Sequence, residues 1–242
     1  MAIVKICGAT SGRDVALLAA SGADLVGMWH GVPGGHADLS VQQLSAVAAA
    51  AHRFGGVEPV LVTFLHDASA VLSVVRRTGV RWVQLHGYQR PAMVHALKAA
   101  PRLDLTVVKV LHVKDGRCLE RPFIGAYERA GTDCFLLDAA TDDGRVGSTG
   151  QQLPAAAVAE LADLVSVPFL LAGGISADNR TDYDTVLDHP RFLGIDVDTA
   201  ARDDQGSFHG GRIRALRRHW YEDSVVLRVS DGFDELEQEA IA

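Results

Sequence analysis

The sequence is poor in cysteine and contains no block of basic residues. Only three of its 242 residues are cysteines (Cys7, Cys118 and Cys134), and their spacing fits neither a disulfide framework nor a zinc-binding pattern. Such sparse cysteine usage is typical of a reducing compartment, so we expect a cytoplasmic protein. The formal net charge is −7 and the basic residues are scattered, which argues against a nucleic-acid partner.

Long apolar runs are absent as well. No stretch approaches the roughly 20 apolar residues that a membrane-spanning helix requires, so no membrane association is expected. The first residues also lack the charged and apolar regions of a secretory signal peptide. What the sequence does have is 48% apolar residues, enough to build a full hydrophobic core.

The apolar residues fall into short runs that alternate with helical patterns. Runs with the length and composition of buried strands occur at 3–6, 24–29, 59–64, 81–85, 105–111, 133–137, 168–172 and 192–197. Segments with apolar spacing near 3.6 residues, typical of amphipathic helices, occur at 11–20, 40–54, 68–79, 90–100, 153–165 and 210–222.

Eight strands with helical crossovers predict an α/β fold with a parallel sheet, closed as a single (β/α)8 TIM barrel. An open doubly wound sheet is the alternative, but no GxGxxG fingerprint follows the first strand. We assign residues 1–222 to the barrel and residues 223–242 to a short C-terminal extension. The extension, an apolar run followed by acidic residues, is expected to pack on the barrel or at a dimer edge, with a frayed terminus as the alternative. The sequence leaves a monomer and a homodimer equally open.

Polar residues stand where several of these strands end. In a (β/α)8 barrel the active site lies at the carboxyl ends of the strands. Cys7 ends the first strand, His86 the fourth and Asp138 the sixth, and Asp198 with Thr199 follows the eighth. A buried structural cysteine and a helix-capping carboxylate are the simpler interpretations of Cys7 and Asp138. A thiol and a carboxylate on the same rim, however, form a candidate base and acid.

Several motifs in these positions resemble the phosphoribosylanthranilate isomerase family of tryptophan biosynthesis. They occur in family order between residue 3 and about residue 216: VKICG at 4–8, GADLVG at 22–27, VQLHG at 83–87, LLD at 136–138, GSTG at 147–150, LAGGISADN at 171–179 and IDV at 195–197. The resemblance implies a TIM barrel and an Amadori rearrangement, which turns an N-glycosidic aldose into a 1-amino-1-deoxyketose.

The resemblance also implies roles for individual residues. Asp138 would be the general acid that opens the ribose ring, and Cys7 the general base that removes the C2 proton. Gln84 and His86 of the VQLHG motif would line the substrate site. No metal and no other cofactor is implied, and the partner is a small phosphorylated sugar–amine adduct. Because a cysteine acts as a base only through its thiolate, we expect a cationic or amide-lined neighbourhood that lowers the pKa of Cys7.

The substrate phosphate is expected at the loops after the seventh and eighth strands. The backbone amides of Gly173 and Gly174 are candidate donors, because glycine lets a backbone approach an anion closely. A following helix N-terminus would add its dipole. An ordinary left-handed turn is the alternative interpretation of this Gly-Gly pair.

Two positions depart from the family pattern. The family has an arginine after the second strand that binds the anthranilate carboxylate, whereas here His36 stands near that position, and histidine cannot reproduce the bidentate arginine fork. The eighth strand is followed by Asp198 in place of a small Ser-Gly turn. A carboxylate there would repel the phosphate unless Arg202 or Thr199 compensates.

Histidines are the last unusual feature. His30, His36, His66, His86 and His112 all lie at or just beyond the ends of the second to fifth strands, without HxH or HxxxH spacing. We interpret them as polar lining of a pocket rather than as a metal site. Two alternatives to a genuine family enzyme stay open: a diverged paralogue with another, non-phosphorylated or non-anthranilate substrate, and a non-catalytic barrel that binds a small molecule.

Overall fold

The computed structural model describes residues 2–140 and 151–222. The proposed C-terminal extension (223–242) and the GSTG segment (147–150) lie outside the described residues.

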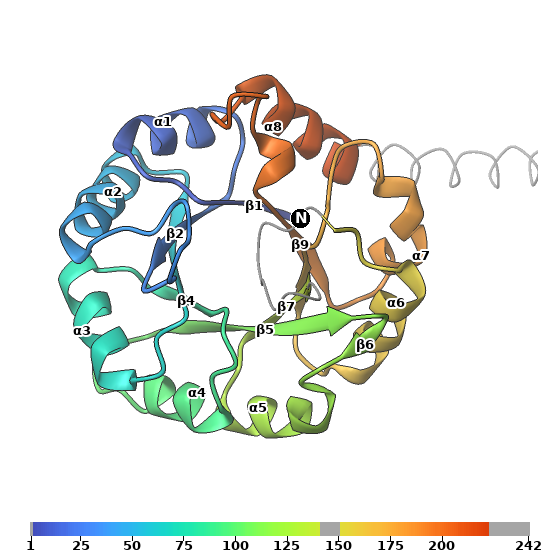
Figure 1. Ribbon diagram of the computed structural model, residues 1–242, viewed down its shortest axis with the longest axis horizontal. Helices are drawn as coiled ribbons and strands as arrows, with labels where there is room; N and C mark the ends of the chain where they lie inside the picture. Colours follow the sequence, from blue (N-terminus) through green and yellow to red (C-terminus); the bar gives the residue numbers. More distant parts are fainter. Residues whose placement is uncertain (1, 141–150, 223–242) are drawn as a thin grey trace, which may run out of the picture.

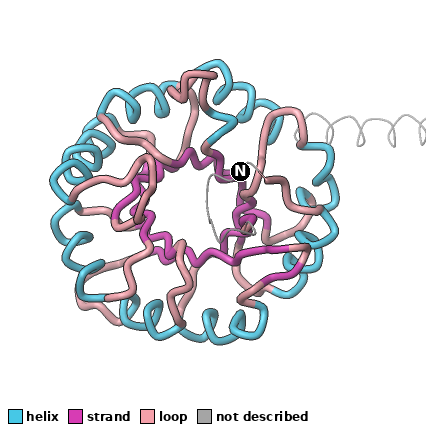
Figure 2. Tube along the Cα trace, viewed as in Figure 1, coloured by secondary structure: helices cyan, strands magenta, loops and turns pink. Residues whose placement is uncertain are grey.

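The strands of the described chain close into a ring, which is surrounded by helices (Figures 1 and 2). Around the ring the order is β4-β3-β2-β1-β9-β8-β7-β5, and β5 pairs again with β4. All of these neighbouring strands are parallel. The predicted (β/α)8 barrel is therefore confirmed, and the open sheet is excluded because the ring closes.

The observed elements follow the predicted ones closely. The ring strands are β1 (Ile3–Cys7), β2 (Leu25–His30), β3 (Glu58–Thr63), β4 (Trp82–Leu85), β5 (Thr106–Lys114), β7 (Cys134–Ala139), β8 (Phe169–Leu171) and β9 (Phe192–Val197). The α-helices are α1 (Gly12–Ala20), α2 (Val41–Phe54), α3 (Ala68–Thr78), α4 (Pro91–Lys98), α5 (Ile124–Ala130), α6 (Ala155–Leu164), α7 (Asp184–Leu187) and α8 (Gly210–Arg217).

Three features were not predicted. Helix α5 lies outside the helical segments expected from the sequence. A two-residue strand, β6 (Arg117–Cys118), folds back antiparallel on the end of β5. After β8, the expected helix N-terminus is reduced to a 3-10 turn at Arg180–Tyr183 followed by the four residues of α7. The chain after β8 therefore presents no long helix dipole to a ligand, and the corresponding expectation is wrong.

Side chains alternate along each strand between the helix-covered outside and the barrel interior. The larger core lies between the strands and the helices. The interior is filled by two smaller apolar clusters, around Val60 and Val62 on one side and around Val108, Val110 and Leu136 on the other. The last inward-facing residue of each strand lies at the carboxyl end of the barrel, which is the mouth.

Candidate active site

Cys7 is the last inward-facing residue of β1. Its side chain packs with Trp29, Val60 and Val62 inside the barrel and is 7% exposed. The indole Nε1 of Trp29 donates a hydrogen bond to Cys7 Sγ at 3.1 Å. Opposite the sulfur, a Cβ atom at Gly27 would lie 2.6 Å from Sγ, so only glycine leaves room for the thiol. The thiol is thus held in one orientation at the mouth.

The glycine that follows Cys7 is favoured by its backbone conformation. Gly8 has a φ of 89°, and a Cβ atom there would lie 2.6 Å from Nη2 of Arg202. The Gly8 N–H donates to the Gly27 carbonyl at 2.9 Å, which turns the chain away from β1 and directly toward α1. Helix α1 then begins with a capping box between Ser11 and Asp14.

Beneath Cys7 lies a buried ion pair that the sequence analysis did not identify. Lys5 Nζ donates to Asp196 Oδ2 at 2.7 Å, and both side chains are almost completely buried. A Cβ atom at Gly27 would lie 3.2 Å from Lys5 Nζ, so the ammonium and the Cys7 sulfur border the same space. Although burial alone would lower the pKa of Lys5, the Asp196 carboxylate raises it, so the ammonium stays charged.

The expectation of a lowered thiol pKa is wrong. Burial raises the pKa of Cys7 to about 12, because the low-dielectric interior disfavours the thiolate. The Lys5 ammonium and the Trp29 hydrogen bond act in the opposite direction, while Asp196 and Asp198 add to the increase. Cys7 is therefore a thiol at neutral pH, with one cation beside it that favours its ionisation.

Asp138 is the last inward-facing residue of β7 before Ala139. Its Oδ1 accepts the Ala139 N–H at 2.8 Å, and its Oδ2 lies 3.4 Å from Nε2 of His86. The Gln84 amide contacts His86 Nδ1 at 3.0 Å. Since the amide nitrogen donates to Nδ1, the ring carries its proton on Nε2, facing Asp138. Burial lowers the pKa of His86, so this imidazole is neutral.

The strand order places the thiol and the carboxylate on nearly opposite walls. From β1 the ring passes through β9 and β8 before it reaches β7. Cys7 and Asp138 therefore both point into the barrel mouth from strands that are three positions apart in an eight-stranded ring. A small molecule lying in the mouth would have one of these groups on each side.

The carboxylate that follows β9 is paired within the protein. Arg202 Nε donates to Asp198 Oδ1 at 2.6 Å, and the guanidinium also donates to the carbonyls of Gly8 and Gly206. His36 Nε2 lies 3.7 Å from Asp198 Oδ2, although the His36 side chain is 57% exposed. Thr199 is exposed and begins a 3-10 turn. Of the two compensating residues expected from the sequence, Arg202 is the one that forms the ion pair.

Gly173 and Gly174 form a tight, hydrogen-bonded turn at the end of β8. Both residues have positive φ values, 77° and 65°, and a Cβ atom at Gly174 would lie 2.7 Å from the backbone nitrogen of Gln152. Asn179 Nδ2 donates to the Gly174 carbonyl at 2.9 Å, and Asn179 Oδ1 accepts the Ser176 N–H. The turn is therefore left-handed, as the alternative interpretation has it, and it is also rigidly held at the mouth.

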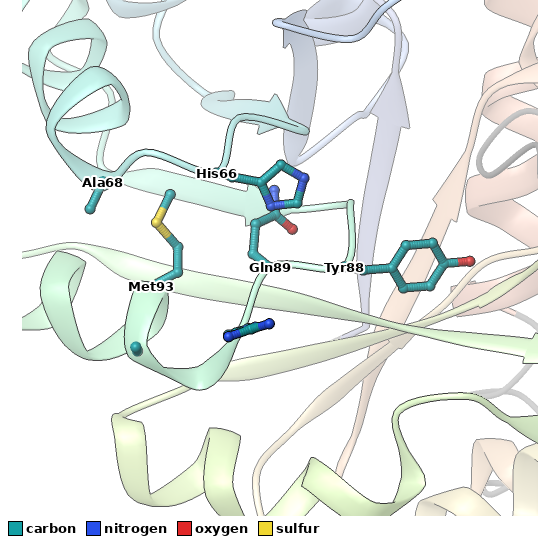
Figure 3. A pocket seen from close by; sticks show the side chains of 7 residues that line it. His66, Ala68, Tyr88, Gln89 and Met93 are labelled. Atoms are coloured by element: carbon teal, nitrogen blue, oxygen red, sulfur yellow. The ribbon is translucent and has the colours of Figure 1, made fainter.

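A separate pocket of about 550 Å³ lies on the rim, between the loops that follow β3 and β4 (Figure 3). It is lined by His66, Ala68, Tyr88, Gln89, Arg90, Ala92 and Met93. Of the residues expected from the sequence, only His66, interpreted there as polar pocket lining, lines it. The Tyr88 ring extends away from Ala68 and Met93 and packs at a tilt against the His112 ring, with 4.8 Å between the ring centroids.

Within residues 2–140 and 151–222, no group of three or more His, Cys, Asp or Glu side chains has an arrangement that could hold a metal ion. No helix in the same ranges is both long and apolar enough to span a bilayer.

Comparison with known proteins agrees with this geometry. The family model of N-(5'-phosphoribosyl)anthranilate isomerase matches residues 4–213. The enzyme of that name from Halobacterium salinarum is 35% identical over 190 residues, covering 77% of this chain and 82% of the relative. The one from Afipia carboxidovorans is 29% identical over 232 residues, covering 95% of this chain and 94% of the relative.

The solved structure of phosphoribosyl anthranilate isomerase from Thermus thermophilus has the same fold. It superimposes with a TM-score of 0.72 at 24% sequence identity, covering 90% of this chain and 97% of that one. The family match extends over both candidate catalytic residues and over the ends of all the ring strands. The chain therefore belongs to the phosphoribosylanthranilate isomerase family of isomerases.

Proposed function

We propose that this protein converts N-(5'-phosphoribosyl)anthranilate into its 1-amino-1-deoxyketose isomer, with Asp138 as general acid and Cys7 as general base. The observation that carries the proposal is the placement of one thiol and one carboxyl group on nearly opposite walls of the same barrel mouth. The family match over residues 4–213 supports the choice of reaction. We assign the reaction to the cytoplasmic synthesis of tryptophan.

The chemistry requires two proton transfers at neighbouring substrate atoms. Asp138 donates a proton to the ring oxygen, the C1–O bond breaks, and the nitrogen lone pair forms a cationic C1=N iminium. The thiolate form of Cys7 then removes the C2 proton, and the C2–H electron pair forms the C1=C2 bond of an enolamine while the C1=N pair returns to the nitrogen and neutralises it. Tautomerisation of the enolamine gives the ketone. Each positioned proton transfer accelerates such a reaction by about 10²–10⁴-fold.

The surroundings of the two residues suit these steps. The Ala139 N–H donates to Asp138 Oδ1 and holds the carboxyl group, while His86 Nε2 lies 3.4 Å from Oδ2. Lys5 places a positive charge beside Cys7, which offsets part of the cost of forming a buried thiolate. A base that ionises with difficulty is also a strong base once ionised, as removal of a carbon-bound proton requires.

Substrate binding uses the rest of the rim. The amides of Gly173 and Gly174 and the Thr199 turn are the candidate phosphate donors, and the Asp198–Arg202 pair removes the repulsion of an isolated carboxylate. His36 stands at the edge where the anthranilate carboxylate would lie. A related isomerase has been solved with reduced 1-(o-carboxyphenylamino)-1-deoxyribulose 5-phosphate, and this compound is a suitable probe for the present site.

Rescue of a tryptophan auxotroph that lacks this isomerase tests the proposal. The wild-type gene should restore growth without tryptophan, and so should Cys118→Ser, which changes a thiol outside the mouth. Cys7→Ser and Asp138→Asn should fail although the proteins accumulate. A folded, well-expressed wild-type protein that does not support growth would contradict the proposal.

A further inference from the structure

A second histidine stands at the barrel mouth, and a buried carboxylate fixes its ring. His112 is fully buried, and its Nδ1 lies 2.6 Å from Oε1 of Glu120. The other carboxylate oxygen accepts the backbone N–H of His112 at 2.8 Å. Glu120 is itself only 4% exposed. Both oxygens of this buried carboxylate contact His112, and Oε1 also lies 3.9 Å from Nζ of Lys109.

The unpredicted strand β6 brings Glu120 to this place. After β5 the chain reverses at Asp115 and Gly116, whose φ values of 49° and 72° are those of a tight two-residue hairpin turn. The returning strand is fixed by a hydrogen bond from the Leu119 N–H to the His112 carbonyl at 2.9 Å. The hairpin therefore delivers Glu120 to the side of His112.

The proton on His112 is placed by this contact. Burial alone would raise the pKa of Glu120, but the His112 hydrogen bonds and the nearby Lys109 ammonium hold it below its usual value, so the carboxylate is ionised. An imidazole nitrogen 2.6 Å from an ionised carboxylate must carry the proton. In the neutral ring, Nε2 is then left as a hydrogen-bond acceptor.

His112 lies on the wall of the barrel that carries Asp138. Val108, Val110 and His112 follow one another at a spacing of two along β5, so all three face the barrel interior. The Cα of His112 pairs in register with that of Asp138. Strand β5 lies four positions from β1 in the ring of eight, directly across the barrel from Cys7. The His112 ring lies 5.8 Å from the His86 ring, edge to face, so the two imidazoles and Asp138 line the same wall.

Nε2 of His112 is buried and has no hydrogen-bond partner among the described residues. A buried polar atom without a partner is costly, and such atoms commonly serve a ligand. We propose that His112, oriented by Glu120, is a further substrate-contacting residue, and that its Nε2 accepts a hydrogen bond from a hydroxyl of the substrate sugar. This inference rests on the proposed function, because it takes the occupant of the mouth to be the ribose-derived chain.

The test measures the His112 ring directly. In protein labelled with ¹⁵N-histidine, the Nδ1-protonated tautomer should be seen in the free enzyme. Addition of the reduced product analogue should change the ¹⁵N chemical shift of Nε2 to that of an unprotonated imidazole nitrogen that accepts a hydrogen bond. In Glu120→Gln the side-chain amide would donate to Nδ1, so the proton should move to Nε2. The acceptor would become a donor, and kcat/KM should fall.

Activity gives a second readout. His112→Phe keeps an aromatic ring but removes both nitrogens, and kcat/KM should fall by about 5- to 150-fold, the range for leaving one buried polar group without its partner. His52→Gln, an exposed change on α2, is the matched control and should leave kcat/KM unchanged. Circular dichroism must show that each variant is folded. If His112→Phe does not fold, the histidine resonances of the wild-type protein decide whether Nε2 of His112 contacts the ligand.

The inference and the proposed function fail differently. Wild-type turnover and analogue binding with an unmoved Nε2 resonance would overturn the role of His112 alone. A folded His112→Phe with wild-type kcat/KM would do the same. A wild-type protein that neither turns over phosphoribosylanthranilate nor binds the analogue would overturn both.

Discussion

Arg202 Nε donates to Asp198 Oδ1 at 2.6 Å, so a guanidinium offsets the negative charge of the carboxylate that follows β9. This pair explains how an acidic residue can stand beside an expected phosphate site. Two like charges about 4 Å apart repel by about 1 to 4 kcal/mol at effective dielectric constants of 80 to 20. The ion pair removes most of that repulsion for an incoming phosphate.

Arg202→Gln should therefore raise KM for the phosphorylated substrate by at least about fivefold, the factor that 1 kcal/mol of restored repulsion gives. The double variant Arg202→Gln, Asp198→Ser should recover much of the loss, because it removes the carboxylate as well. Arg121→Gln, which breaks an exposed ion pair with Glu160, is the control. Steady-state kinetics on the four proteins decide the matter, and an unchanged KM in the single Arg202 variant would contradict this account of the pair.

Cys7→Ser and Asp138→Asn should each lower kcat by at least about 10²-fold, the effect of losing one acid or base group. Both changes preserve the size of the side chain, so the fold should persist. Cys118→Ser changes a thiol outside the barrel mouth and should retain full activity. Near wild-type turnover in both site variants would show that the chemistry lies elsewhere.

Alkylation of Cys7 should report its raised pKa. Because burial holds the thiol pKa at about 12, the thiolate is scarce at neutral pH, and the iodoacetamide rate should still be rising above pH 10. Cys7→Ser identifies which part of the signal belongs to this thiol. The dependence of the rate on pH is the relevant quantity, since burial slows access at every pH. A rate that levels off below pH 8 would mean that the thiolate is stabilised in the free enzyme.

His36→Arg should improve binding of the anthranilate carboxylate. His36 packs edge-on against Trp29 at 4.8 Å and is largely exposed, so a longer side chain can be accommodated there. An additional charge-assisted contact contributes about 1.5–3 kcal/mol, or about 10- to 150-fold in affinity. Competition from Asp198 favours the lower end of that range. His66→Arg on the next loop is the control, and an unchanged KM in His36→Arg would place the carboxylate elsewhere.

The positions of the ring strands could be predicted from the sequence because each strand is a short apolar run between helical patterns. The strand-end location of Cys7 and Asp138 followed from the same pattern. Strand β6 was missed because two residues are too few for a periodic signal, although the Asp115–Gly116 pair is a known hairpin signature. Glu120 was missed with it.

The interior charges were missed for a different reason. Lys5 and Asp196 lie within runs that were read as uniformly apolar, yet each stands two residues before a rim residue, Cys7 or Asp198, and so shares its inward direction. Counting back by two from each rim residue would have found them. The thiol pKa could not be predicted, because it depends on the balance between burial and the Lys5 charge.

The most direct test of the central claim is turnover of phosphoribosylanthranilate by the purified protein. The substrate is generated in the cuvette, and its conversion into the 1-amino-1-deoxyketose is followed by loss of substrate fluorescence. Chromatography with mass detection should show a product peak of the same mass as the substrate, because the two compounds are isomers. The account predicts saturable turnover by the wild-type protein that falls at least about 10²-fold in Cys7→Ser and in Asp138→Asn. A folded wild-type protein that forms no product above the uncatalysed rate, or equal turnover in all three proteins, would contradict it.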